Sequence, residues 1–505
     1  MKKKWIIAGL AAAAVCSLFI SGCGGEKKGE GDKIVRVAGT VSVSTTMDPA
    51  KDWEGWYIVR YGVGETLFRI SGNLKVEPWL AESFEKLDDL TWKITLKKNV
   101  TFSNGEAMTP QKVIDSLKRV GGMNERAGYL KTAEYRVEGN AVIIKTEKPR
   151  FTLINDLADP YATIVDVANT KDFEKAPIAT GPFVMASYES NKKAVMKKNP
   201  KYWGGEVKSE GVEYTKVSDA NALAMSLQNG EVDVAQDLTV DAAENVAKKD
   251  NLVVKRVAQP RIYQLYFNLD RMQDPAVREA VMYGLNKKEI GEKLLKGSVS
   301  AAYSAFPDGS SYGAKNLEPR MFDEAKAKDV LAAAGYKDTN SDGIVEKNGK
   351  PLTVQLSIYK RAASAAIAIE IQSQLKKAGM DVQIKTFEKA SSFGAGDFDM
   401  GIYYVVTMPV GDPYDFLHNS YDKDSKVNFG HYHNPKVQEW LGEMQTLAEG
   451  DAKTALVNQI QQAAIDDGAM DFIGFNTIQV GMAKTVKGYL ITPNDYYQVT
   501  KDLEK

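Results

Sequence analysis

The stretch from residue 352 to residue 387 restricts the fold most, because it alternates between two kinds of secondary structure. A strand pattern over 352–358 precedes a helical pattern over 364–378, which ends at Gly379, and a second strand pattern covers 382–387. Two strands joined through a helix usually form a parallel pair in an α/β layer. The sequence therefore predicts an α/β domain with a mainly parallel sheet in this part of the chain.

The chain is too long for a single core. It has 505 residues, and single hydrophobic cores usually stop growing at about 250–300 residues. Its 65 basic and 66 acidic residues give a net charge of -1, which argues against a polyanion-binding surface. We therefore expect two or three domains and no nucleic-acid partner.

The N-terminal residues predict export and a lipid anchor. A lysine-rich head, an apolar run and small residues over 1–22 have the layout of a secretory signal. Its end, Ile20-Ser-Gly-Cys23, resembles a bacterial lipobox, in which the cysteine is acylated and becomes the mature N-terminus. A plain signal peptide with a chance cysteine is the alternative. Residues 23–33 are rich in Gly, Lys and Glu, so we expect a solvated tether.

A landmark at residues 176–204 places the chain in a known family. Gly181-Pro182 predicts a tight turn, 183–188 a strand and Asn199-Pro200 a second turn. The strings APIATGPF and NPKYWG of this landmark, with PWLAESF at 78–84, FSNGE at 102–106 and NGEVD at 229–233, resemble the family 5 extracytoplasmic solute-binding proteins. These proteins are receptors of ABC importers for peptides, nickel and metal chelates.

The resemblance implies a bilobal α/β fold of the periplasmic-binding-protein type. Two large α/β lobes would be joined by hinge strands, with the strand at 262–269 crossing between them and a small accessory domain inserted in the first lobe. The expected parts are lobe I at 34–70, 176–265 and 481–505, the accessory domain at 71–175, and lobe II at 266–480.

The implied function is a monomeric, lipid-anchored extracytoplasmic receptor on the periplasmic or outer face of the cell membrane. It would capture nickel or a metal-chelator complex between its lobes, use no cofactor, and deliver the ligand to the permease subunits of an ABC importer. A receptor for dipeptides or oligopeptides is the alternative, and a surface lipoprotein without a transport role is a third hypothesis. An exported hydrolase is disfavoured, because the sequence Gly309-Ser-Ser-Tyr-Gly313 is not followed by a helical pattern.

Aromatic residues and one arginine are the first candidate ligand contacts. Trp53 and Tyr57 occupy a stretch that lines the cleft in the family, although core packing is the simpler interpretation of such a stripe. Arg126 followed by Tyr129 matches the nickel-binding subgroup, where the arginine contacts a ligand carboxylate and the aromatic residue covers it. The planar guanidinium suits that contact, and an exposed surface arginine is the alternative.

Further candidates lie in the last quarter of the chain. The predicted ligand-binding set is completed by Tyr404, Thr407 and Asp412. At most one of the neighbours Tyr403 and Tyr404 should face the cleft, because side chains alternate along a strand. Peptide-binding members carry an acidic residue a few positions before the Asp-Pro step, where this chain has Pro409. The departure favours nickel or a metallophore over ordinary dipeptides.

The three histidines of the chain, His418, His431 and His433, fall within sixteen residues. Imidazole is a good ligand for divalent metals such as nickel, so His431 and His433 are predicted metal ligands. Scattered surface histidines would give the same pattern.

One acidic loop imitates a metal-binding motif. Asp338-Thr-Asn-Ser-Asp342-Gly343 matches the start of a calcium loop, but Gly349 stands at position twelve instead of a glutamate. The sequence therefore favours a tight hairpin turn in which Asp and Asn side chains bond to nearby backbone.

Overall fold

The computed structural model describes residues 33–361, 363–390, 393, 398–447 and 449–505. The predicted signal, Cys23 and most of the predicted tether lie outside these residues. Within the described ranges, no helix has the length and apolar character needed to cross a membrane.

Among the described residues, one sheet of eleven strands extends through both lobes in the order β17-β16-β18-β12-β19-β11-β1-β10-β9-β8, with β13 paired to β19. The lobe II strands are β13 (Val299–Ala301), β16 (Thr353–Tyr359), β17 (Asp381–Phe387) and β18 (Met400–Val406). The lobe I strands are β1 (Ile34–Gly39), β8 (Phe183–Glu189), β9 (Lys193–Lys198), β10 (Gly211–Lys216) and β11 (Val234–Ala235).

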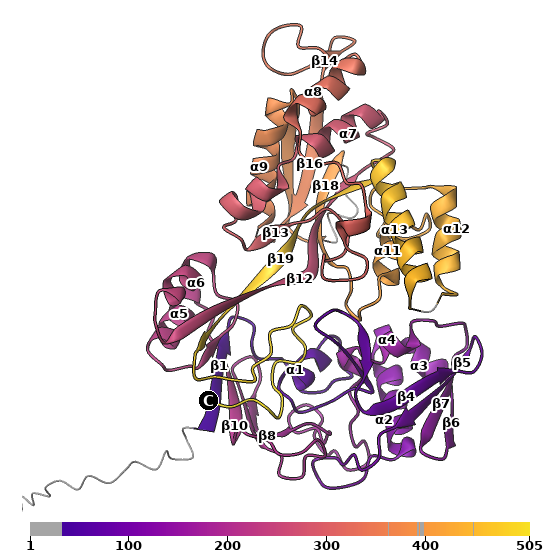
Figure 1. Cartoon of the computed structure of the whole chain (residues 1–505), viewed down its shortest axis with the longest axis vertical. Coiled ribbons are helices and arrows are strands. Elements are labelled where there is room, and N and C mark those ends of the chain that lie inside the picture. The colour runs from indigo at the N-terminus through magenta and orange to yellow at the C-terminus, as the bar shows by residue number, and fades with distance from the viewer. Residues whose placement is uncertain (1–32, 362, 391–392, 394–397, 448) are drawn as a thin grey trace, which may run out of the picture.

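The two lobes are connected by two long strands, β12 (Leu252–Phe267) and β19 (Met470–Ala483), which run side by side from one lobe into the other (Figure 1). They pair antiparallel, and their register shifts between Ala258 and Ile262 and again between Tyr263 and Gln264. Such irregularities bend and twist a ladder locally, and we call this part of the pair, between the two lobes, the hinge. The predicted crossing strand is the second half of β12.

The sheet in lobe II is mixed, and the expectation of a mainly parallel sheet is wrong. The predicted strand-helix-strand unit is present, because β16 pairs in parallel with β17 and α9 (Ser364–Lys377) connects them. However, β12 runs antiparallel to both β18 and β19. The reason is that β12 runs into the lobe next to β18, and β19 runs back out of it beside β12.

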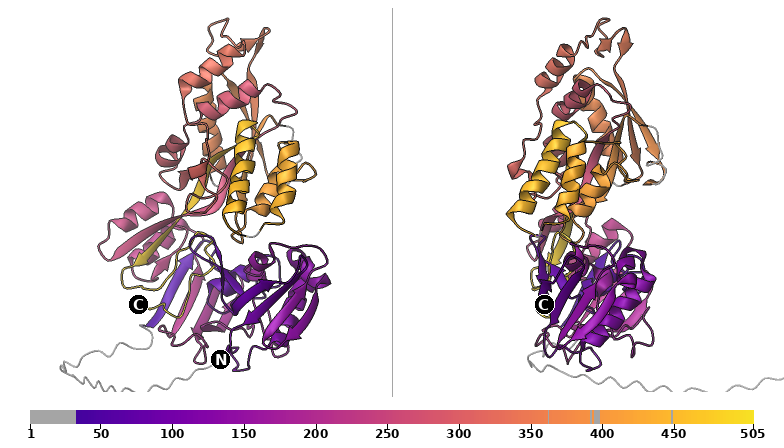
Figure 2. Two further views of the ribbon diagram at one scale, coloured as in Figure 1. Left: turned by 45° about the vertical axis from the view of Figure 1, so that its right-hand side comes forward. Right: turned by 90° about the vertical axis from the view of Figure 1, so that its right-hand side faces the viewer.

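Helices cover lobe II on several sides (Figures 1 and 2). They are α7 (Pro275–Gly284), α8 (Glu324–Ala333), α9, α11 (Tyr414–Tyr421), α12 (Pro435–Met444) and α13 (Asp451–Asp466). The first of them begins as predicted, because the Asp274 side chain accepts a hydrogen bond from the backbone N–H of Ala276 and Pro275 occupies the first turn. Its residues Val277 and Val281 are buried in the lobe II core.

The accessory domain lies beside lobe I, below α11 and α13 in Figure 1. It holds a four-stranded antiparallel sheet in the order β4 (Ala81–Lys86), β5 (Thr91–Leu96), β7 (Ala141–Lys145) and β6 (Glu134–Glu138). The helix α2 (Pro110–Met123) packs against this sheet, and α3 (Gly128–Thr132) packs against α2. As predicted, Thr109 begins α2 by accepting a hydrogen bond from the backbone N–H of Lys112. Other short elements are α1 (Gly55–Arg60), β2 (Phe68–Ile70), β3 (Val76–Pro78), α4 (Leu153–Asp156), α5 (Ala220–Gln228), α6 (Val240–Ala247), β14 (Glu346–Lys347) and β15 (Lys350–Pro351).

The landmark at 176–204 packs against the chain just after α1. The backbone N–H of Gly181 donates to the carbonyl of Val63 at 3.0 Å. The Tyr202 hydroxyl and the Trp203 indole N–H donate to the two carboxylate oxygens of buried Glu65, at 2.7 and 2.8 Å. These contacts bring the chain back to lobe I after the accessory domain.

Candidate ligand-binding cleft

A cavity of about 610 Å³ lies where the two lobes, the hinge and the accessory domain meet. Trp53, Trp56 and Tyr496 line it from lobe I, Arg261 from the hinge, and Phe416 from α11. A second cavity of about 300 Å³ shares Trp56 and Arg261 with the first. The two cavities therefore form parts of one cleft with aromatic and cationic walls.

The lobe I wall of the cleft is held in place by Asp495. Its carboxylate accepts a hydrogen bond from the indole N–H of Trp56 at 2.9 Å and pairs with Arg60 at 3.1 Å. The guanidinium of Arg60 lies 5.3 Å from the ring centres of both Trp56 and Tyr57. Because the Asp495 carboxylate is bonded to both Trp56 and Arg60, it positions the aromatic wall.

Arg126 reaches the cleft from the accessory domain and is already paired there. Its guanidinium forms an ion pair with Asp159 and lies 3.6 Å from the ring centre of Trp53. Burial raises the pKa of the Asp159 carboxyl, and Arg126 opposes that rise. The ion pair fixes the arginine over an indole ring that is 59% exposed.

Two further arginines lie around the ring of Tyr404. The guanidinium of Arg261 on β12 is 5.8 Å from the ring centre, and that of Arg361, just after β16, is 5.4 Å from it. Neither forms an ion pair with a carboxylate among the described residues. Both line the cavity, so each can offer its guanidinium to a ligand.

One acidic side chain balances this charge in part. Asp415, in the first turn of α11, is the one acid among the described residues that line the main cavity. Asp415 follows Asp412-Pro413 in the sequence, whereas the resemblance to the peptide-binding members predicts a ligand-binding acid before these two residues. The spacing of Asp415 and Asn419 was an available sequence signal, because residues four positions apart share one face of a helix. Both residues line the cavity.

The structure brings some of the predicted ligand contacts together. Trp53, Arg126 and Tyr404 line the main cavity, and Tyr57 lines the second. The expectation that at most one of Tyr403 and Tyr404 faces the cleft is wrong, because both line the cavity. The cavity extends round both faces of β18. Its lining includes Tyr266, which packs near the Tyr403 ring, and Arg361, which lies near the Tyr404 ring.

Three other predicted contacts lie behind the cavity wall. The Tyr129 hydroxyl is 3.2 Å from that of Tyr161. Thr407 is fully buried, with its N–H bonded to the carbonyl of Pro260 at 2.8 Å. Asp412 is paired with Lys453 and accepts a hydrogen bond from the N–H of Tyr414. None of the three lines either cavity.

The predicted metal ligands His431 and His433 lie outside both cavities. Tyr432 between them is buried and both histidines are exposed, and the His431 ring nitrogen Nδ1 lies 2.6 Å from Asp270. His418 is also outside the cavities and stacks on Tyr414 at 5.4 Å. In the described ranges no histidine belongs to a group of three possible metal ligands. This arrangement gives the histidine prediction no support.

Comparisons with known proteins agree with this architecture. The family described as bacterial extracellular solute-binding proteins, family 5 Middle, matches residues 75–428. The nickel-binding protein NikA of Staphylococcus aureus is 26% identical over 489 residues, 95% of this chain and 96% of its own. The oligopeptide-binding protein AppA of Bacillus subtilis is 26% identical over 547 residues, 99% of each chain.

Solved structures show the same bilobal arrangement. A nickel ABC transporter structure from Bacillus halodurans is 27% identical and superposes with a TM-score of 0.86, covering 93% of this chain and 99% of the other. The fold also matches AppA in complex with a nonapeptide, with a TM-score of 0.67 at 21% identity over 93% of this chain and 99% of that one. Because the family match covers most of the chain, the protein belongs to the family 5 bacterial extracellular solute-binding proteins and is a substrate-binding protein of an ABC importer rather than an enzyme.

Proposed function

We propose that this receptor captures a metal chelate that carries carboxylates, with nickel as the first candidate metal. The observation that carries the proposal is the pair Arg261 and Arg361 around Tyr404, two cations without a carboxylate partner among the described residues. A guanidinium bonds both oxygens of a carboxylate at once. The nickel-binding names of two relatives support the choice of metal.

The size of the main cavity favours a compact ligand. A sphere of about 610 Å³ is roughly 10 Å across, whereas nine extended residues span about 30 Å. The aromatic rings of Trp53, Trp56 and Tyr404 supply flat apolar walls, which suit the ring or chain of a small chelator. An amino-acid complex of a divalent metal fits this description better than a long peptide does.

Ligand capture would work by a shift in population between open and closed forms. The ligand would contact Trp53 of lobe I and Arg126 of the accessory domain on one side, and Arg361 and Tyr404 of lobe II on the other, because all four line the cavity. A ligand that binds both sides favours the closed form by its extra contacts there. The closed form would then be presented to the permease subunits of the importer.

A short peptide is the second candidate, because Asp415 supplies a feature that the sequence comparison missed. Its carboxylate lines the same cavity as the two free arginines. A zwitterionic dipeptide could place its ammonium group near Asp415 and its carboxylate near Arg261 or Arg361. The relationship to AppA supports this alternative.

The membrane anchor is a separate part of the proposal. The lipobox at 20–23 would place two or three acyl chains on Cys23, and each buried methylene contributes about 0.8 kcal/mol, so the receptor would stay on the outer or periplasmic face of its membrane. Cell fractionation tests this: the chain should sediment with membranes, and Cys23→Ser should release it. A chain that sediments equally with and without Cys23 would refute the anchor.

Titration calorimetry separates the candidate ligands. The mature chain with Cys23→Ser is titrated with nickel alone, nickel with free histidine, and a mixture of dipeptides. We expect heat with the nickel–histidine mixture and little with nickel alone, because the chelator carries the carboxylates. Heat with dipeptides alone would refute the metal proposal and support the peptide receptor.

A further inference from the structure

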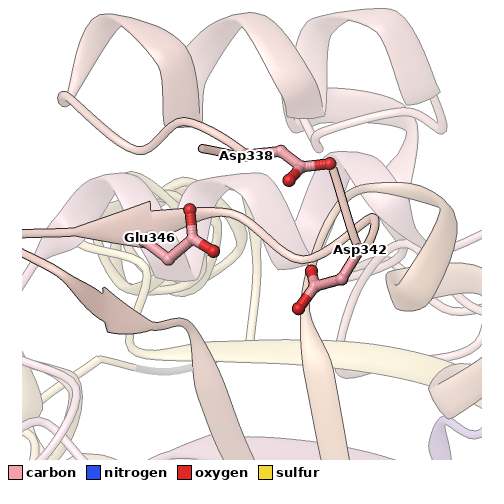
Figure 3. A group of neighbouring side chains, drawn as sticks. All are labelled: Asp338, Asp342 and Glu346. Carbon is pink, nitrogen blue, oxygen red and sulfur yellow. The ribbon is translucent and has the colours of Figure 1, made fainter. Parts of the chain in front are cut away.

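The loop between α8 and β14 gathers three carboxylates far from the ligand cleft. Asp338, Asp342 and Glu346 each offer an oxygen, and these oxygens lie within 4.8 Å of one another (Figure 3). None of the three residues lines either cavity of the cleft. In Figure 1, β14 lies at the end of lobe II that points away from lobe I.

The burial of Glu346 makes this group more than a surface cluster. Glu346 is 8% exposed, and its Oε2 accepts hydrogen bonds from the N–H and hydroxyl of Thr339 at 2.7 and 2.8 Å. Its Oε1 is inaccessible to solvent and has no hydrogen-bond partner among the described residues. An unpartnered carboxylate oxygen is costly to bury, so this oxygen lacks a positively charged or donor group.

The described part of the chain offers no basic side chain to this group. Asp338, Asp342 and Glu346 take part in none of its ion pairs, and the bonds that reach Asp338 and Asp342 come from loop backbone N–H groups and the Asn340 amide. Three like charges at this spacing repel one another. A cation between them would remove the repulsion and give the buried Glu346 carboxylate the positively charged partner that it lacks among the described residues.

The spacing along the chain identifies the class of cation. Asp338, Asn340 and Asp342 hold the first, third and fifth positions of a calcium loop, Gly343 holds the sixth with φ +87°, and the carbonyl of Ile344 the seventh. The missing glutamate at position twelve is replaced in space by Glu346 at position nine. Oxygen ligands of this kind select hard cations, and flexible carboxylate geometry suits calcium better than magnesium.

We propose that this loop is a calcium site, with Asp338, Asp342 and Glu346 as its charged ligands. The ion would connect the segment after α8 to β14, whose backbone already pairs Lys337 with Glu346. It would therefore stabilise the outer end of lobe II and take no part in binding the transported ligand. Three carboxylates at an extracytoplasmic site suggest a dissociation constant of about 10⁻⁴ to 10⁻³ M.

Calorimetry and thermal unfolding of the metal-stripped mature chain with Cys23→Ser test this site. We expect about one calcium ion bound per chain and a rise in Tm of roughly 2–6 °C at about 5 mM calcium. Asp342→Asn and Glu346→Gln should each weaken calcium binding about tenfold or more, because each removes a charged ligand. Asp342 is exposed, so its variant keeps the test valid if Glu346→Gln fails to fold.

Two control variants test whether calcium binds at this loop and not elsewhere on the chain. Asp329→Asn removes an exposed acid of α8 outside the group and should bind calcium like the wild type, as should the cleft variant Arg361→Gln. Absence of heat and of a Tm shift in the wild type would overturn the proposal. Equal calcium binding by the wild type, Asp342→Asn and Glu346→Gln, loss of binding in Arg361→Gln, or a stronger response to magnesium would also overturn it.

Discussion

Lys453 on α13 and Asp412 just before α11 form an ion pair in which each side chain is 3% exposed. Lys453 also bonds to Glu449 at 2.8 Å, and Asp412 accepts the N–H of Tyr414 at the start of α11. The pair therefore connects two helices of lobe II and positions the helix that carries Asp415 into the cleft.

Lys453→Met should destabilise the chain strongly. Removing one partner leaves the Asp412 carboxylate buried without its counter-charge, which typically costs about 3–5 kcal/mol. The free energy of unfolding of the mature chain, measured by urea denaturation, should fall by that amount, since both side chains are inaccessible.

The matched control is Lys436→Met, which removes an exposed lysine paired with Glu439 three residues away. Such surface pairs contribute about 1 kcal/mol or less. The double variant Asp412→Asn with Lys453→Met should lose less than the sum of the single changes. A loss below about 1 kcal/mol in Lys453→Met alone would show that the pair does not hold the two helices together.

Stability should depend on pH through Glu65. Burial raises the pKa of this carboxyl to about 7, and the hydrogen bonds from Tyr202 and Trp203 oppose that rise. The folded state therefore keeps a proton between about pH 5 and 7 that the unfolded chain has lost. Stability is fully present below that window and falls as pH rises through it, by on the order of 3 kcal/mol in total.

Glu65→Gln should remove this component, because glutamine resembles the protonated acid: its oxygen can accept from Trp203 and its amide can donate to Tyr202. Urea denaturation at several pH values between about 5 and 8 measures the difference between variant and wild type. Glu82→Gln, an exposed position on β4, should keep the wild-type pH dependence. The assignment fails if Glu65→Gln keeps it too.

Gly181 cannot accept a side chain, because an added Cβ would lie 2.3 Å from the carbonyl oxygen of Gly62 and 2.6 Å from that of Val63. Gly181→Ala should therefore destabilise the chain by roughly 1–3 kcal/mol or more, since two backbone segments would have to separate. Gly122→Ala in α2 is the control, because a Cβ there meets nothing within 4 Å. It should stabilise the chain by about 0.5–1 kcal/mol. Urea denaturation measures both, and equal effects would contradict the close approach.

Features that depend on neighbouring residues were predicted from the sequence. The helices that begin at Pro110 and Pro275 follow Thr109 and Asp274, whose side chains bond to the first turn two or three residues later. A tight turn was also predicted at Gly181, where the structure has a bend. Glycine is needed there because another segment approaches closely, which no local pattern reveals.

The cleft was only partly predictable, because its charges come from distant parts of the chain. Arg261 and Arg361 are one hundred positions apart and meet at Tyr404 only because β18 pairs with both β12 and β16. The histidines gave the opposite error: His431 and His433 are close in sequence, yet both are exposed and neither lines the cleft. Glu346 shows the same limit of sequence reasoning. Counting along the chain places Gly349 at the twelfth position, where a calcium loop has a glutamate. In the structure, the carboxylate beside Asp338 and Asp342 comes from Glu346 at the ninth position.

The proposed role of the free arginines predicts a loss of affinity without a loss of stability. Arg361 is exposed and has no ion-pair partner among the described residues, so Arg361→Gln should leave the free energy of unfolding nearly unchanged. A hydrogen bond to a charged group contributes about 1.5–3 kcal/mol, so affinity for a nickel–histidine complex should fall by roughly 10- to 100-fold. Calorimetry at two salt concentrations measures both the loss and its electrostatic origin, because the wild-type affinity should depend more strongly on salt than that of the variant. Arg136→Gln, an arginine of the accessory domain whose side chain is 68% exposed, is the matched control and should bind like the wild type. Equal affinities for the wild type and Arg361→Gln would remove this arginine from the binding site.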